Sequence, residues 1–472
     1  MIKSGRQDKL LSALNVNNIE QTHRVALLGY KYQKKHTMKP LKLIAATAIC
    51  LSAITAFAGT AEKSTGLPAK HKLIFIGNSA EEKTTEAYDS LITIFYEDQF
   101  RHAQDPQAPY FLLMSRDSKI AMGVGGKVQG NLSYDFDGSI SGLDFTPYTI
   151  PVPRDPGNVT RFQAGMNQSS LLFTIFGDSR FGHYIVNVQG EFSGASSTFK
   201  LKKAYITIGH LTLGKTKSSF SDPAAMPSTV ETEGPAGAID DNAILLRYAY
   251  TFSKKYTVAA SIETPSNDYD VYDGVTEATS DCAPKLAAYL QYGGNSNHVR
   301  LAGMVKTMRY RNLLAGKNHR ETGYGVSLTA VGNLSSPVTF YGGINYGKGI
   351  ANMLNNLSCG NNDMLSYSAA AGDDYGKMYA PETLGWFAAL QYNFSPSVFS
   401  TVVFSQDRIY TKDHTSYTGD GYRYGLYAVA NVFWNVTPRV QIGGEFDWGR
   451  RVNIDGEGSN AHRFALMGAF SF

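Results

Sequence analysis

The sequence lacks the features that mark most other protein classes. Only 18% of its 472 residues are charged, which is low for a soluble α/β enzyme. Beyond the N-terminal stretch it has no uncharged apolar run of about 18 residues, so helical membrane spans are excluded. Its 43% hydrophobic content excludes a disordered chain. The 12% aromatic content and the 46 glycines leave a large β protein.

Runs of basic residues are also missing. The formal charge of +4 comes from residues 1–58, which hold nine Lys or Arg and two acids. The rest of the chain has 35 bases and 38 acids, a net charge of −3. We therefore expect no nucleic-acid partner.

The sequence has few residues in patterns typical of catalytic or metal-binding sites. The ten histidines are scattered and lack metal-ligand spacing, as at His298, His319 and His414. No motif supplies the Asn, His and Ser that a barrel phospholipase needs on its outer wall. We expect no enzyme activity, no metal and no cofactor.

The N-terminus has the pattern of a secretory signal. Residues 38–58 read MKPLKLIAATAICLSAITAFA, in which two lysines precede an apolar core and small residues precede a cleavage site after Ala58. We interpret residues 1–37 as an over-extended start or an unusual leader, so residues 1–58 form leader and signal. Cys50 does not suggest a lipoprotein anchor, because an isoleucine precedes it where such sites have Gly, Ala or Ser.

Residues 59–118 are expected to form a short periplasmic segment. Between Glu81 and His102, apolar residues stand near helical spacing and acids enrich the first turn, which predicts one short helix. A packing helix or frayed linker is favoured over an oligomerising coiled coil, because sustained heptads are absent.

From residue 119 to 472, segments of about ten residues alternate apolar with small or polar side chains, and short and long polar connections alternate between them. This pattern predicts an all-β fold, a 16-stranded antiparallel transmembrane β-barrel of the outer membrane. An even strand number closes the barrel. The expected strands are 119–136, 169–177, 182–193, 199–209, 210–218, 243–253, 256–265, 284–293, 298–312, 321–333, 338–350, 384–394, 398–411, 422–435, 440–451 and 461–472.

The long connections are expected to be external loops and the short ones periplasmic turns. The expected loops are 137–168, 219–242, 266–283, 351–383 and 412–421. Alternation also predicts which side chains meet lipid. The last strand should turn Phe464, Leu466, Phe470 and Phe472 outward, and the strand from 422 should turn Tyr422, Tyr424, Leu426, Val432 and Trp434 outward. A terminal Phe472 also resembles the C-terminal signal of bacterial outer-membrane barrels.

Three pieces of sequence support a family resemblance. They are FGDSRFGHYIVNVQGEFSG, LKKAYITIGHLTLGKTKSSFSDP and the EGPAG…ILLRYAY run, in this order between residues 176 and 250. In these pieces the chain resembles the DcaP-like trimeric outer-membrane porins. The resemblance implies a homotrimeric 16-stranded porin of the Gram-negative outer membrane, which admits small anionic solutes such as dicarboxylates.

A 16-stranded barrel is wide enough for an aqueous channel unless a loop narrows it. The loop 219–242 contains five acids and no Lys or Arg. We expect it to fold inward as the constriction, with a solvated surface loop as the alternative. The five acids are Asp222, Glu231, Glu233, Asp240 and Asp241.

Basic side chains recur at positions that alternation places inside the barrel. Opposite the acidic loop they would create a transverse field that orients anionic solutes; the alternative is ion pairing that only holds the loop against the wall. Lys202 competes with Lys203 for the inward position, and Arg247 is expected to offer its guanidinium to a solute or to Glu231 and Glu233. The predicted basic lining is Lys203, Arg247, Arg300, Lys306, Arg423 and Arg463, with Lys215 and Lys217 where the fifth strand meets the loop.

Two further features leave alternatives open. Cys282 and Cys359 fall in the fourth and sixth external loops, where they could form a disulfide or remain separate thiols. The function we expect is passive diffusion of small hydrophilic anions through a lipid-embedded trimer. A loop-mediated adhesin or phage-receptor barrel without an open pore, using loops 137–168 and 351–383, is the competing class.

Overall fold

The computed structural model describes residues 72–75, 111–114, 120–193, 198–253, 255–269, 271, 273–294 and 296–472. The expected leader and signal peptide, and the helix between Glu81 and His102, lie outside the described residues. Within the expected periplasmic segment two short strands are described. They are β1 (Lys72–Phe75) and β2 (Phe111–Met114), which pair in parallel, and β2 continues antiparallel onto β3.

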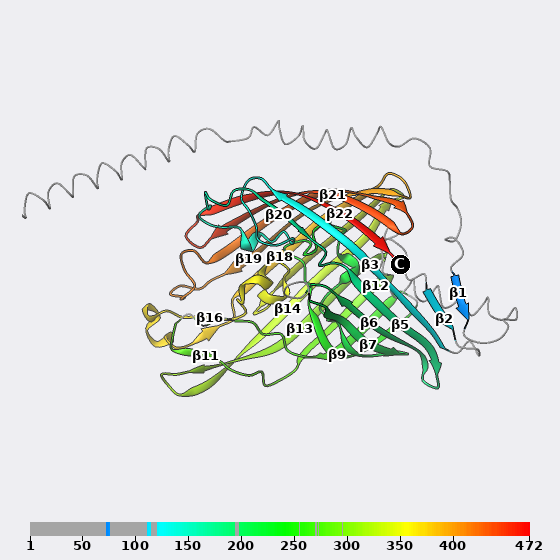
Figure 1. Ribbon diagram of the computed structural model, residues 1–472. Helices are drawn as coiled ribbons and strands as arrows, with labels where there is room; N and C mark the ends of the chain where they lie inside the picture. Colours follow the sequence, from blue (N-terminus) through cyan, green and yellow to red (C-terminus); the bar gives the residue numbers. More distant parts are fainter. Residues whose placement is uncertain are drawn as a thin grey trace, which may run out of the picture. The chain divides into compact units, whose positions relative to one another are not determined.

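Sixteen antiparallel strands form a closed barrel (Figure 1). Each strand pairs with the next along the chain, and β22 pairs back onto β3, so the main sheet has no free edge there. All sixteen predicted strands are confirmed. Their bounds are β3 Ile120–Asp135, β5 Ser170–Ser179, β6 Gly182–Glu191, β7 Lys200–Ile208, β8 Leu211–Lys217, β9 Asn242–Phe252, β10 Tyr256–Glu263, β12 Lys285–Gly294, β13 Asn297–Asn312, β14 Lys317–Ser335, β15 Val338–Lys348, β18 Glu382–Asn393, β19 Val398–Tyr410, β20 Tyr422–Thr437, β21 Val440–Asn453 and β22 Gly458–Ser471.

Shorter elements lie within the long loops, where only connections were expected. β4 pairs with the end of β3, β11 extends the edge of β13, and β16 pairs with β17. Their bounds are β4 Arg161–Gly165, β11 Thr276–Ala278, β16 Leu365–Ser366 and β17 Met378–Tyr379, and the 3-10 turns are Pro147–Thr149, Pro223–Ala225, Ala351–Met353, Leu357–Gly360 and Ala369–Asp374.

Side-chain alternation separates an apolar outer face from a polar interior, as a membrane barrel requires. On β22, Phe464 and Leu466 are exposed on the outer face, whereas Arg463 and Ala465 are buried inside, as predicted. Tyr422 does not follow the prediction: it was expected to face lipid and is fully buried inside the barrel. An irregularity in the pairing of β20 with β21 at this strand end shifts the alternation by one residue.

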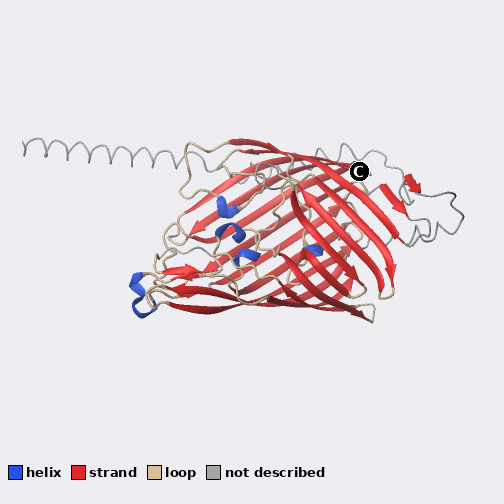
Figure 2. Cartoon of the chain, turned by 60° about the horizontal axis from the view of Figure 1, so that its bottom comes forward, coloured by secondary structure: helices blue, strands red, loops and turns tan. Residues whose placement is uncertain are grey.

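Long loops gather at the end of the barrel away from the C-terminus, and short turns lie at the other end (Figure 2). Three of the long loops pack into the interior. Their buried apolar residues come from 136–160 (Ile140, Phe145, Ile150), 218–241 (Phe220, Ala225, Val230) and 349–381 (Ile350, Met353, Leu354, Leu357). The loops 137–168 and 351–383 were expected to be external, and part of each instead fills the barrel.

No helix in the described part of the chain is long and apolar enough to cross a membrane.

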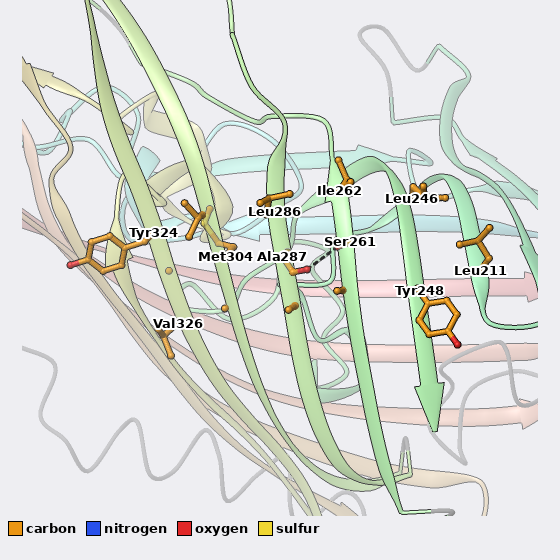
Figure 3. A pocket seen from close by; sticks show the side chains of 15 residues that line it. Leu211, Leu246, Tyr248, Ser261, Ile262, Leu286, Ala287, Met304, Tyr324 and Val326 are labelled. Carbon is orange, nitrogen blue, oxygen red and sulfur yellow. Dashed lines mark hydrogen bonds between the residues drawn. The ribbon is translucent and has the colours of Figure 1, made fainter. Parts of the chain in front are cut away.

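An apolar depression of about 820 Å³ lies on the outer wall across β8 to β14 (Figure 3). Its floor is formed by Ala260 on β10, Ala288 on β12 and Gly303 on β13. These three residues are opposite one another in the register of the adjacent strands. Larger side chains such as Ile262 and Leu286 rise beside them. The depression therefore reflects small residues on three adjacent strands rather than an opening to the interior.

Candidate functional site: the inner loop and the lumen wall

The loop 218–241 crosses the lumen and docks on the far wall. The carboxylate of Glu445 on β21 accepts hydrogen bonds from the backbone amides of Val230 and Glu231, both at 2.7 Å. Asn431 donates to the carbonyl of Ser228 at 2.9 Å, and Asn345 donates to that of Gly237 at 2.7 Å. Inward-facing polar residues of the strands thus satisfy the backbone of a loop that water reaches poorly.

Gly237 shows how closely this loop approaches the wall. A Cβ at this position would collide with backbone atoms of Trp386 and Gln406 on β18 and β19. The sequence EGPAG therefore lets the loop lie flat against the strands.

Ion pairs fix both ends of the loop. At its start, Asp222 accepts from His298 Nε2 at 2.8 Å and lies 3.4 Å from the Arg300 guanidinium. At its end, Asp240 pairs with Lys217, and Asp241 pairs with the buried Lys285. Three of the five predicted loop acids are thus held by bases, which is the arrangement that clamps a loop to a wall.

The other two loop acids lie in the middle of the loop. Glu231 accepts a hydrogen bond from the Tyr427 hydroxyl at 2.5 Å. Burial raises the pKa of the Glu231 carboxyl well above its ordinary value, and the nearby Glu445 adds to the shift. Burial, reinforced by Asp144, raises the pKa of the Glu233 carboxyl to about 7. Near neutral pH these two acids therefore carry less negative charge than the sequence suggests.

Basic residues line the inner wall of β7 to β9. Lys203 pairs in register with Gln189, whose strand neighbour Asn187 is buried inside. The pairing of β6 with β7 is irregular here, so Lys202 is an extra residue and forms an ion pair with Glu191 at 2.5 Å. The bulge therefore brings both lysines to the inner side, where sequence alternation allowed only one.

Arg247 on β9 also lies on this wall, opposite Thr212 and Ser261, both buried inside. Its Nη1 donates to the carbonyl of Lys217 at 3.4 Å. The expected contact with Glu231 or Glu233 is not formed.

Three of the predicted lumen bases hold loops. Lys306 donates to Asp363 of loop 349–381 at 2.7 Å, and both side chains are fully buried. Arg463 contacts Asp135 at 2.6 Å and donates to four carbonyls of loop 136–160. Arg300 donates to the carbonyl of Ser221 at 3.0 Å, besides its pairing with Asp222.

Two predicted lumen bases differ from expectation. Lys215 pairs in register with Ile244, whose side chain is 56% exposed on the outer face, so Lys215 lies outside the lumen. Thr216, not Lys215, has the inward position at this point of β8. Arg423 is partly exposed at the irregular start of β20, where it has no partner in the pairing with β21.

The prediction missed several residues that hold the interior together. Lys285, fully buried at the start of β12, lies 3.0 Å from Glu263 and also pairs with Asp241. Asp407 accepts from the Tyr422 hydroxyl and from Asn356, both at 2.8 Å. Each of these two residues is a charged side chain at an inward-facing position of an otherwise apolar strand. This was the feature of the sequence that could have identified Lys285 and Asp407.

Cys282 and Cys359 are free and exposed. In the described part of the chain, no cluster of His, Cys, Asp and Glu side chains could hold a metal ion.

Comparison with known proteins places this barrel in a family. A model of the DcaP outer membrane protein family matches residues 113–472. No curated protein matches the sequence. The fold is similar to that of the outer membrane channel DcaP of Acinetobacter baumannii, with 18% identity and a TM-score of 0.64 over 76% of this chain and 99% of that chain. It is also similar to an anion-selective porin from Comamonas acidovorans, with 10% identity and a TM-score of 0.49 over 75% of this chain and 100% of that one.

The family match covers the complete barrel, including the inner loop and the basic wall that faces it. The chain therefore belongs to the DcaP outer membrane protein family and is an integral outer-membrane β-barrel of porin type.

Proposed function

We propose that this porin mediates passive diffusion of small hydrophilic anions, with dicarboxylates as the substrate class. The observation that carries the proposal is the cluster of Lys202, Lys203 and Arg247 on the inner wall of β7 to β9. Lys202 forms an ion pair with Glu191, and Arg247 donates to the backbone carbonyl of Lys217. Basic side chains facing water in a narrow lumen attract anions and leave them free to pass.

The state of the acids in the inner loop also supports a preference for anions. Asp222, Asp240 and Asp241 are paired with bases, and the pKa of Glu233 is raised to about 7. The acids of the inner loop therefore add little net negative charge to the constriction near neutral pH.

Reversal potentials of the purified protein in planar bilayers test the proposal. In a salt gradient we expect step-like conductance and an anion preference, with conductance reduced by a small dicarboxylate. Cation preference would contradict the proposed selectivity. Silent membranes would instead favour the competing class, a loop-mediated receptor or adhesin whose three inward loops close the barrel.

We also propose that the protein assembles as a homotrimer through the side where the barrel wall is lowest. β8 has seven residues and β10 has eight. Seven residues at about 3.3 Å each, tilted by about 40°, cover about 18 Å, less than the apolar band of about 25 Å. Lys215 also lies on the outer face here. A second copy would cover both the short wall and this lysine.

A further inference from the structure

An arginine cluster lies on the outer face of the barrel, at the external ends of β13 and β14. Arg309 and Arg320 are directly opposite each other in the antiparallel register. The Arg309 side chain is at an outward-facing position of β13. Val305, four residues earlier on the same strand, is 49% exposed, whereas Met308 and Tyr310 on either side of Arg309 are buried inside. Arg311 follows two residues further along β13, on the same face.

The three arginines concentrate positive charge at one place on the outer face. Like charges directly opposite on neighbouring strands, with Cβ atoms about 5 Å apart, destabilise a sheet. No described carboxylate forms an ion pair with any of the three arginines, and the nearest acid in register, Glu277 opposite Arg311, is exposed. Arg311 donates to Asn318 at 3.1 Å.

One donor of the cluster is buried without a partner. Arg309 Nε is shielded from solvent and has no hydrogen-bond acceptor among the residues that the structure describes. A buried unsatisfied guanidinium donor is costly and calls for a missing acceptor. Arg408 Nε on the outer face is likewise buried without an acceptor among the described residues, but its guanidinium stacks 4.8 Å from the Tyr410 ring, and Lys348 lies 3.5 Å from Glu382.

The height of the cluster matches the headgroup layer of the outer leaflet. Tyr324 on β14, Tyr346 on β15 and Tyr410 on β19 are exposed on the outer face, as in an aromatic girdle. Arg320 lies four residues beyond Tyr324 towards the external hairpin of β13 and β14, which is about 10 Å higher along a tilted strand.

We propose that Arg309, Arg311 and Arg320 bind the phosphate groups of a glycolipid of the outer leaflet. Guanidinium groups bind phosphate oxygens through paired hydrogen bonds, and an anion between Arg309 and Arg320 would relieve their repulsion. The lipid is favoured over soluble phosphate because the cluster faces the membrane side of the barrel, next to the girdle, and not the lumen.

The test measures binding of purified lipopolysaccharide to the detergent-solubilised protein by native mass spectrometry. We expect the double variant Arg309→Gln/Arg320→Gln to bind about tenfold more weakly or worse. Arg180→Gln, an exposed arginine beside Phe181 at a short turn of the opposite end, is the matched control and should bind as the wild type does. The wild type should bind dephosphorylated lipopolysaccharide more weakly than the intact lipid, by a similar factor.

Several results would overturn the proposal. Equal binding by the double variant, or by the dephosphorylated lipid, would show that the arginines do not bind lipid phosphate. Displacement by millimolar inorganic phosphate would identify a soluble-phosphate site instead. If the double variant fails to fold, the single Arg320→Gln variant, whose side chain is exposed, must show weaker binding for the proposal to stand. Channel conductance should be unchanged in all variants, so this test is independent of the proposed anion transport.

Discussion

At the residue scale, Arg247 is the lumen base that most directly tests anion selectivity. Its guanidinium has one backbone contact, at 3.4 Å, and no ion pair among the described residues. We expect Arg247→Ala to reduce the anion-to-cation permeability ratio about fivefold, since a charge contact in a wet pore is worth about 1 kcal/mol. Reversal potentials measure this ratio, and weaker block by a dicarboxylate should accompany the change.

Lys215→Ala is the matched control for Arg247→Ala. It removes a base from the outer face, only a few residues from the same constriction, and should leave selectivity unchanged. Selectivity lost in Lys215→Ala but kept in Arg247→Ala would refute the assignment of the basic wall.

Glu233 gives the channel a pH dependence of defined sign. Its pKa of about 7 means that the carboxyl is neutral below this pH and negative above it. We therefore expect anion preference to be greater at pH 6 than at pH 8, because the added negative charge repels anions. Glu233→Gln should flatten this dependence and keep the preference seen at low pH. A pH profile that is the same in wild type and variant would rule out this role.

Single residues show how far alternation could predict the site. It placed Arg300 and Lys306 inside correctly, because both are in regular stretches of β13. It could not decide between Lys202 and Lys203, and it placed Tyr422 on the wrong face, because both positions adjoin irregular pairings. The alternation of inward and outward side chains holds only within a regular stretch of strand. One extra residue in the strand exchanges the two faces for the residues that follow it.

At the element scale, the inner loop depends on Glu445 more than on any acid of its own. This carboxylate accepts the amides of Val230 and Glu231 and a hydrogen bond from Asn431 at 3.0 Å. We expect Glu445→Ala to release the loop, with higher single-channel conductance and more open-state noise. Thermal unfolding should show a loss of about 2–5 kcal/mol, since buried amides lose a charged acceptor. Unchanged conductance would show that the loop does not limit the pore.

The loop 349–381 is held by one buried ion pair. Lys306 and Asp363 are both inaccessible to solvent, and Asp363 also accepts the amides of Asp268 and Asn352. Lys306→Met leaves a buried carboxylate without its cation, at a cost of about 3–5 kcal/mol. We expect a lower melting temperature, and the double variant with Asp363→Asn should recover part of the loss. No recovery would mean that the two side chains act independently.

Strands could be predicted from the sequence, and loop positions largely could not. A strand of a membrane barrel must alternate lipid-facing apolar side chains with inward-facing ones along its whole length. Each of the sixteen strands can therefore be recognised from its own sequence. The inward path of loop 349–381 depends on Lys306, more than forty positions earlier in the chain, and on the loop 218–241 that packs beside it. Such contacts between distant segments leave no periodic pattern in the sequence.

At the scale of the whole molecule, the barrel wall is uneven in height. β13 and β14 have 16 and 19 residues, whereas β8 has seven. A wall that is too short for the apolar band must thin the bilayer or be covered by protein.

The proposed trimer gives this low wall a specific test. Leu213 on β8 is 54% exposed on the outer face, and Val402 on β19 is 57% exposed on a tall part of the wall. Leu213→Trp adds bulk where a second copy would pack closely, which costs about 1–3 kcal/mol per interface. Val402→Trp adds the same bulk where fluid lipid can adjust. We expect light scattering in mild detergent to show a trimer for the wild type and for Val402→Trp, and smaller species for Leu213→Trp. A monomeric wild type would contradict the trimer, and an intact trimer in Leu213→Trp would place its interface on another part of the wall.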